Sequence, residues 1–387
     1  MHVSTASFAY PEVDGAARSD LAQRLTARDA PPDVFIFSTC LRTEVLVHGD
    51  RADLEQSVNR AFGEPSVLEL ATVRTGDKAV EHLFRISAGL ESPILGEREI
   101  LTQFRQAVQA AQEARVVGGL LSKMLETAVA VGRQARELLP ESPHDSMAAV
   151  AAQVVGPYDR VAVLGSGVMA KAVVYGLFGL PAPPEIVVVA RHPEKVTFDN
   201  IGVWTFDRAP IALDEFPAVI SATSAKQRLI SDSDLAAVLS SRSVPLTLVD
   251  MAMPPDFSPP GGAPVNYVDI DDLAHMAARR PRRDDADALV TAAAGDAYRH
   301  LADHATVGPV IGGLMRNADE TVNGVVERFA GRLGKGDDRA LLQQTAHTVA
   351  RTLLARPVSY IRSADGPGDA VEVIAEAFGL DDGLDDA

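Results

Sequence analysis

The sequence predicts an α/β protein built from three parts: an α+β domain over residues 1–142, a domain with a parallel sheet over residues 143–282, and a domain of long helices over residues 283–387. Three features support this prediction. Strand-like and helical runs are mixed in the first part, they alternate in the second, and helical periodicity continues through the third. A chain of 387 residues exceeds one ordinary core, and a hydrophobic content of 47% is enough for several.

The first part is predicted to contain two strands followed by helices. Residues 34–39 (VFIFST) and 44–49 (EVLVHG) are rich in β-branched and aromatic residues, and they flank the polar link 40–43. Residues 51–62 are predicted to form a helix, because apolar residues recur there at four-residue spacing. Helical periodicity then continues over residues 77–139, with breaks at glycines.

The second part contains continuous apolar runs that each end in turn-forming residues, namely 160–167, 185–191, 218–224 and 246–254. Helical segments alternate with these runs. Alternation of this kind indicates βαβ units and a parallel sheet that is buried on both faces, as in Rossmann-like domains.

The third part shows two amphipathic stripes, one from Leu314 to Phe329 and one from Leu342 to Leu353. The pair Gly308-Pro309 is expected to interrupt or bend the first long helix. The pattern alone allows two interpretations, a helical bundle within one chain or a dimer interface.

Composition excludes several classes of protein. No run approaches 18 apolar residues and the N-terminus lacks a secretory signal, so we expect no membrane contact and a cytoplasmic, reducing location. The single cysteine excludes an internal disulfide. A formal net charge of −17 disfavours RNA binding over the whole surface. Local cations are the candidates for RNA contacts: Lys123, Arg133, Arg136 and the run from Arg279 to Arg283.

A GxGxxA turn follows the first apolar run of the second part and opens a helix; it comprises Gly165, Ser166, Gly167, Val168, Met169 and Ala170. Gly165 permits a tight turn, Gly167 lets the backbone approach a pyrophosphate, and Ala170 keeps the helix close to the sheet. The start of the helix supplies free N–H groups and partial positive charge. The pattern predicts dinucleotide binding; a purely structural turn is the alternative.

The second apolar run ends at Ala190-Arg191, where an NAD site usually carries an acid that holds the ribose 2′-hydroxyl. An arginine accommodates a 2′-phosphate instead. Arg191 therefore favours NADP(H), with a solvated loop residue as the alternative.

Cys40 lies between the two predicted strands, beside Thr39 and Arg42. A lone cysteine is more often a small buried hydrophobe than a nucleophile. Here the neighbouring hydroxyls and Arg42 are expected to lower the thiol pKa and leave it accessible. A thiolate, a downstream histidine and a nicotinamide site together suggest reduction of an acyl group through a thioester. His300 and His304 lack a third ligand, so no metal site is predicted.

Six segments resemble the glutamyl-tRNA reductase family, and they occur in the family's order along nearly the whole chain. The two most specific are residues 38–44 (STCLRTE), which resemble the family's STCNRTE around its catalytic cysteine, and residues 82–100, which resemble HLFRVxxGLxSxxLGExQI. The others resemble VxGAGxM, DxAxPRD, YxxDDL and LLHxP, at residues 163–169, 250–256, 268–273 and 353–357.

The resemblance implies NADPH-dependent reduction of glutamyl-tRNA(Glu) to glutamate-1-semialdehyde, the first step of the C5 pathway to 5-aminolevulinate and porphyrins. Cys40 would attack the ester carbonyl, and hydride would then reduce the thioester. His82 matches the active-site histidine, as a proton donor or orienting group. The implied substrate-binding residues are Thr39, Arg42, Ser92 and Glu97. The implied cofactor site comprises the turn from Gly165 to Ala170 together with Arg191.

The family further implies a homodimer through the C-terminal helices, and a glutamate-1-semialdehyde aminomutase as a possible partner. It implies that the nucleotide domain must swing towards Cys40 before hydride transfer. This chain departs from the family pattern at Leu41, Arg98 and Ala149, and it lacks the N-terminal NHKT-like segment. Two alternatives therefore stay open: a paralogue that reduces another aminoacyl-tRNA or acyl thioester, and a non-catalytic dimeric scaffold.

Overall fold

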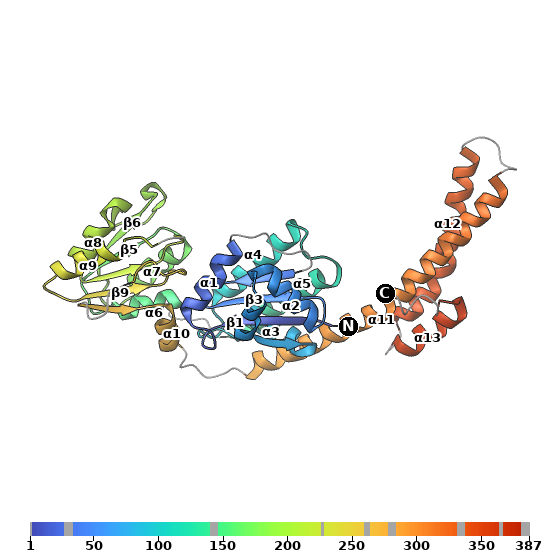
Figure 1. Cartoon of the computed structure of the whole chain (residues 1–387), viewed down its shortest axis with the longest axis horizontal. Helices are drawn as coiled ribbons and strands as arrows, with labels where there is room; N and C mark the ends of the chain where they lie inside the picture. Colours follow the sequence, from blue (N-terminus) through green and yellow to red (C-terminus); the bar gives the residue numbers. More distant parts are fainter. Residues whose placement is uncertain are drawn as a thin grey trace. The chain divides into compact units, whose positions relative to one another are not determined.

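The computed structural model describes residues 2–26, 34–139, 146–225, 228–258, 264–277, 284–330, 337–363 and 367–380. The chain forms two compact units, His2–Gly295 and Asp296–Ala387 (Figure 1). The basic run from Arg279 to Arg283 lies outside the described residues.

A four-stranded antiparallel sheet opens the larger unit, with strand order β2-β3-β1-β4. Its strands are β1 (Ser4–Ala9), β2 (Val34–Ser38), β3 (Arg42–Val47) and β4 (Thr72–Thr75). The two predicted strands are confirmed as β2 and β3. The sequence analysis missed β1, whose Ser- and Ala-rich sequence carries little β-propensity. Pairing with a strand on each side keeps β1 buried in the sheet centre.

Helices cover this sheet and extend it. They are α1 (Gly15–Thr26), α2 (Arg51–Phe62), the 3₁₀ helix Pro65–Leu70, α3 (Asp77–Ser87), α4 (Arg98–Glu113) and α5 (Gly119–Leu138). Phe8 on β1 and Phe62 on α2 meet edge to face at 5.4 Å in the core beneath α2. The loop between α3 and α4 closes on itself: the Gly96 N–H donates to the Gly89 carbonyl at 3.0 Å. A Cβ on Gly89 would lie 3.0 Å from the Gly96 Cα, so this closure requires glycine.

A six-stranded parallel sheet forms the rest of the larger unit, with order β10-β9-β8-β5-β6-β7. Its strands are β5 (Arg160–Leu164), β6 (Glu185–Ala190), β7 (Gly202–Thr205), β8 (Ala218–Ser221), β9 (Leu246–Asp250) and β10 (Val265–Val268). This is the strand order of Rossmann folds, in which ligands bind where the order reverses, here between β5 and β8. The predicted parallel sheet is confirmed.

The helices that accompany this sheet are α6 (Met147–Val154), α7 (Val168–Phe178), α8 (Ala209–Glu215), α9 (Asp232–Ser241) and α10 (Ile270–Ala277), with short 3₁₀ turns at Pro193–Lys195 and Phe206–Arg208. Apolar side chains from α6 and α7 pack against the sheet in one continuous core.

Three helices complete the chain: α11 (Asp284–Ala330), α12 (Asp337–Ser363) and α13 (Pro367–Phe378). The expectation that Gly308-Pro309 interrupts the first long helix is wrong, because α11 is continuous through both residues. Packing explains this: Val307, Val310 and Leu314 contact apolar residues of α12, which holds the helix on both sides of the proline (Figure 1).

The predicted stripe on α12 is not buried within the single chain, which leaves the dimer-interface interpretation open. The buried residues are Leu354, Val358 and Ile361, whereas Val349 and Leu353 are 53% and 71% exposed in the single chain. None of the described helices combines the length and hydropathy needed to cross a membrane.

Candidate active site

Cys40 lies at the tip of a tight turn that joins β2 to β3. The Thr39 N–H donates to the Arg42 carbonyl at 2.8 Å, and the Tyr10 N–H donates to the Leu41 carbonyl at 2.9 Å. The Thr39 hydroxyl accepts from the Leu41 N–H at 3.3 Å. The turn is therefore fixed on both sides, and the Cys40 side chain is half-buried.

A small pocket of about 20 Å³, room for about one water molecule, forms beside Cys40. Six residues are predicted for catalysis and substrate binding, and five of them line this pocket: Thr39, Cys40, Arg42, Ser92 and Glu97. The sixth, His82, does not. The remaining wall includes Glu99 and Met169, and Met169 belongs to the GxGxxA turn. The candidate nucleophile and the candidate cofactor turn therefore meet at one pocket.

The electrostatic surroundings of Cys40 reverse the expectation of a lowered thiol pKa. Burial, and then the carboxylate of Glu97, raise the pKa of Cys40 to about 12; the field of Arg18 acts in the opposite direction. Arg42 does not offset this effect, because its guanidinium donates to Glu44 and to the Glu91 carbonyl. Cys40 is accordingly a neutral thiol at rest, and nucleophilic attack requires a base.

Glu97 is a second titratable residue that lines this pocket. It is only 6% exposed. Burial, and then the neighbouring Glu99, raise its pKa to about 7; the Met147 N–H and Arg42 oppose that shift. Burial also raises the pKa of Glu99.

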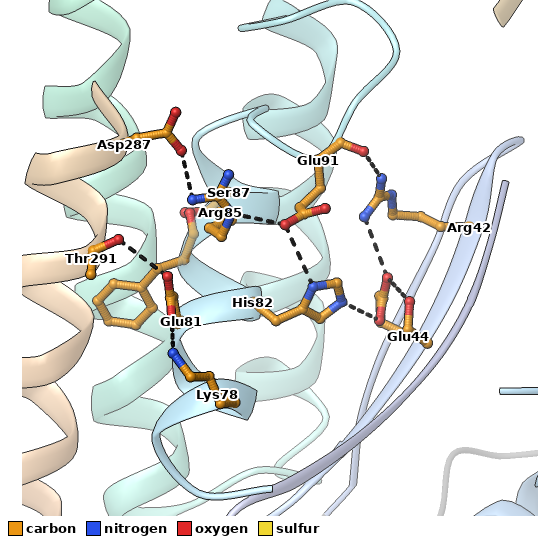
Figure 2. A network of polar contacts seen from close by, with 12 residues as sticks. Arg42, Glu44, Lys78, Glu81, His82, Arg85, Ser87, Glu91, Asp287 and Thr291 are labelled. Atoms are coloured by element: carbon orange, nitrogen blue, oxygen red, sulfur yellow. Dashed lines mark hydrogen bonds and ion pairs between the residues drawn. The ribbon is translucent and has the colours of Figure 1, made fainter. Parts of the chain in front are cut away.

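His82 lies in a buried network that also contains Arg42 and Glu44 (Figure 2). Glu44 on β3 joins the two: its carboxylate accepts from Arg42 at 3.4 Å and lies 3.1 Å from His82 Nε2. His82 Nδ1 has no hydrogen-bond partner among the described residues and lies 4.0 Å from Glu91. Removing one member of such a buried ionic network generally costs about 3–5 kcal/mol. The structure thus connects His82 to Arg42 through Glu44, whereas His82 itself does not line the pocket of Cys40.

The same network continues to the start of α11 (Figure 2). Arg85 donates to Glu91 at 2.9 Å and pairs with Asp287 at 2.6 Å. Burial opposes ionisation of Glu91, but His82 and Arg85 together lower its pKa. Thr291 on α11 donates to Glu81 on α3 at 3.1 Å. The first turns of α11 are therefore anchored to the helix that carries His82.

Arg18 is a site residue that the sequence analysis missed. It is 2% exposed, donates to the Val13 and Cys40 carbonyls, and pairs with Asp271 on α10. Its position in the polar segment of α1 gives no sign of burial. Leu41 also shares an apolar core with the nucleotide domain. The resemblance implies that this domain swings towards Cys40, whereas the structure already holds the two together through this shared core and the ion pair.

The GxGxxA turn has the geometry of a phosphate-binding loop. Gly165 has φ +117°, and a Cβ there would meet the Ala222 carbonyl at 2.6 Å. Gly167 caps the N-terminus of α7 without a side-chain hydrogen bond. A Cβ on Gly167 would meet no protein atom within 4 Å. Ala170 is buried against the sheet and Val168 is 80% exposed. Ser166 lines a small hollow beside Gly165.

Two buried acids support the adjacent strand ends. Asp256 accepts from the Ser221 and Thr223 hydroxyls at 2.6 Å and 2.9 Å, so these hydroxyls are already committed. Asp250 at the end of β9 accepts from the Tyr267 hydroxyl at 3.1 Å. Burial, and then Asp256, raise the pKa of Asp250 to about 7.

Comparison with known proteins matches three successive parts of the chain to family models. Residues 5–138 match the glutamyl-tRNAGlu reductase N-terminal domain, residues 149–276 match the shikimate/quinate 5-dehydrogenase family, and residues 285–380 match the glutamyl-tRNAGlu reductase dimerisation domain. A glutamyl-tRNA reductase from Rubrobacter xylanophilus is 30% identical, over 92% of this chain and 88% of that protein. The chain belongs to the glutamyl-tRNA reductase family.

Two further relatives carry the same description. A glutamyl-tRNA reductase from Kineococcus radiotolerans is 29% identical, over 92% of this chain and 86% of that protein. The solved glutamyl-tRNA reductase from Methanopyrus kandleri is 22% identical, over 98% of this chain and 99% of that one, with a TM-score of 0.48.

The residues at the crevice of this reductase fit NADPH. The uncapped start of α7 and the open space at Gly167 suit a pyrophosphate. Arg191 directly follows β6, is exposed, and forms no ion pair with any residue in the described ranges. A guanidinium in that position suits a 2′-phosphate.

Arg191 is expected to determine the preference for NADPH over NADH. Charge-assisted hydrogen bonds to the 2′-phosphate should favour NADPH by about 1–3 kcal/mol. Arg191→Ala should remove most of that preference and leave NADH affinity unchanged, which serves as the internal control. Fluorescence titration of both cofactors measures it. Equal affinities for NADPH and NADH in the unmodified protein would mean that Arg191 does not bind the 2′-phosphate.

Proposed function

We propose that this chain reduces glutamyl-tRNA(Glu) to glutamate-1-semialdehyde with NADPH, the first step of C5-pathway tetrapyrrole synthesis. The observation that carries the proposal is the pocket that Cys40 shares with Met169 of the cofactor turn. Membership of the reductase family supports it. The proposed domains are residues 1–142 for catalysis, 143–282 for NADP(H) and 283–387 for dimerisation.

The residues of the pocket have distinct roles in this proposal. Cys40 attacks the ester carbonyl and forms a thioester, and the tRNA leaves. Arg42 attracts the substrate carboxylate; Glu44 and His82 orient its guanidinium from behind. Thr39 and Ser92 offer hydroxyls at the pocket wall. NADPH supplies the hydride that reduces the thioester, and the small pocket limits competing hydrolysis.

The turn from Gly165 to Ala170 and Arg191 hold the cofactor in this proposal. Arg18 holds the nucleotide domain against the Cys40 turn through Asp271. Hydride transfer requires the two centres in contact. The pocket between them has room for about one water molecule, so it must open to admit the glutamyl group and the nicotinamide.

The direct experiment incubates the purified chain with glutamyl-tRNA(Glu) and NADPH and follows the semialdehyde as an amine-trapped product. Formation of that product with equimolar NADPH oxidation is the expected result. If NADPH is oxidised only with another aminoacyl-tRNA, the chain is a reductase with a different substrate. If no aminoacyl-tRNA acylates Cys40, the chain is a non-catalytic scaffold.

Delivery of the product belongs to the same proposal. An α-amino aldehyde is reactive, so transfer to a glutamate-1-semialdehyde aminomutase in the cytoplasm would protect it. The chemistry of the aldehyde supports this partner.

The dimerisation domain is expected to pair two chains through the exposed apolar face of α12. Val349 and Leu353 lie one helical turn apart and are 53% and 71% exposed. The double change Val349→Asp/Leu353→Asp should convert a dimer into a monomer, because two charges cannot be buried unpaired. Val244→Asp is the matched control, since Val244 is 59% exposed in the other unit. Light scattering after gel filtration measures the mass of each variant. If both variants are dimers, the interface does not include Val349 and Leu353 of α12.

A further inference from the structure

The pocket of Cys40 contains a neutral thiol that must lose a proton before it can attack an ester. A candidate base must lie within hydrogen-bond reach, or reach through one water molecule. The pocket holds about one water molecule. His82 does not line it, and its Nε2 is engaged with Glu44 at 3.1 Å.

Glu97 is the candidate that the pocket offers. Together with Cys40 it lines the pocket, which has room for about one bridging water molecule, and its charge is the largest acidic influence on the thiol. It lies at the closed end of the Gly89–Gly96 loop, where the Glu97 N–H donates to the Ile94 carbonyl at 3.1 Å. The side chain is therefore placed by a rigid loop and by the Met147 N–H.

We propose that Glu97 is the general base and then the general acid of the acylation half-reaction. This step rests on the proposed function. The Glu97 carboxylate takes the proton from the Cys40 thiol, directly or through the pocket water. The thiolate forms a C–S bond to the ester carbonyl carbon. As the C–O bond breaks, protonated Glu97 gives the proton to the departing ribose oxygen, which leaves a neutral ribose hydroxyl on the tRNA and restores the Glu97 carboxylate.

The protonation state of Glu97 suits both directions of transfer. Its pKa of about 7 lets it accept a proton and release it again near neutral pH. The charged groups that face it are Glu99 on α4, which raises its pKa, and Arg42 on β3, which opposes the shift. Arg18 acts on Cys40 from α1 in the direction that lowers the thiol pKa.

The variant Glu97→Gln separates a role of Glu97 as base from an effect of its charge alone. A base predicts slower acylation of Cys40, whereas an effect of charge alone predicts faster acylation. Loss of the carboxylate lowers the Cys40 pKa, so alkylation of this single cysteine by iodoacetamide should become faster at fixed pH. Loss of the base should slow acylation by glutamyl-tRNA without NADPH, by about 10²–10⁴-fold. If both rates rise, Glu97 acts on Cys40 only through its charge and the proposal is overturned.

Glu99→Gln is the matched control, because it removes a second carboxylate of the same pocket. It also restores the glutamine of the family signature at this position. Alkylation should again become faster, whereas acylation should not fall as it does in Glu97→Gln. An equal fall in both variants would attribute the effect to pocket charge and overturn the assignment.

The unmodified protein provides a test that needs no variant. Its acylation rate should rise with pH through an apparent pKa near 7, the value for Glu97. Its alkylation rate should continue to rise far above that pH, because it follows the thiol. Coincident profiles would refute the role of Glu97 even if Glu97→Gln fails to fold. If no aminoacyl-tRNA acylates the protein, the proposed function fails, whereas the alkylation arm still reports the coupling of Glu97 to Cys40.

Discussion

Cys40→Ser is expected to abolish semialdehyde formation, with a loss of at least about 10³-fold, the scale seen when a catalytic nucleophile is removed. A serine hydroxyl ionises even less readily than the Cys40 thiol, and the ester it would form resists hydride attack more than a thioester does. The turn should keep its shape, because its hydrogen bonds use the backbone and the Thr39 side chain. Mass spectrometry of protein quenched without NADPH should show one glutamyl adduct in the unmodified chain and none in the variant.

The control for Cys40→Ser is cofactor binding. NADPH affinity and dimer mass should match the unmodified chain, since neither the α7 turn nor α12 contains Cys40. Semialdehyde produced at the unmodified rate by the serine variant would remove the cysteine from the mechanism.

The sequence located the pocket better than it described its chemistry. Thr39, Cys40, Arg42, Ser92 and Glu97 were assigned from short motifs, and the structure brings them to one pocket. Short motifs can predict these positions because the side chains lie on two local segments, the turn between β2 and β3 and the loop between α3 and α4. Each segment is fixed by its own hydrogen bonds. The direction of the Cys40 pKa shift was predicted wrongly, because it depends on tertiary burial and on where Arg42 points.

The buried charges were beyond the sequence analysis for a related reason. Glu44 directly precedes the apolar run Val45–Val47 in β3, which was the one available signal of an inward carboxylate. Arg18 gives no such signal in its polar helix, and its partners lie on the Cys40 turn and on α10, more than twenty residues away along the chain. Pairing of this kind is set by the docking of domains.

The strands of the parallel sheet also divide into those that the sequence predicted and those that it did not. The apolar runs of β5, β6, β8 and β9 predicted a parallel sheet, since full burial on both faces demands continuous hydrophobic sequence. The edge strands β7 and β10 were missed. Each is four residues long and only partly buried, so neither carries that pattern.

Gly167→Val is expected to weaken NADPH binding by at least about tenfold to a hundredfold, or about 1.4–2.8 kcal/mol, without lowering the melting temperature. The backbone at Gly167 is extended with φ −73°, which valine adopts readily, and no protein atom lies within 4 Å of the added Cβ. The space is therefore needed only by a ligand at the start of α7. Gly165→Ala should behave differently, because its left-handed φ of +117° and the 2.6 Å approach to the Ala222 carbonyl should also destabilise the fold, by about 1–3 kcal/mol.

Gly118→Val is the matched control for Gly167→Val. Gly118 also caps a helix with extended backbone, forms no side-chain cap and has no protein atom within 4 Å of an added Cβ, but it precedes α5, away from the β5–β8 crevice. NADPH affinity should be unchanged in that variant. Calorimetric titration with NADPH, together with thermal melting of all three variants, measures both effects. Full NADPH affinity in Gly167→Val would mean that the pyrophosphate does not approach the start of α7, because the two isopropyl methyl groups would occupy the space it needs.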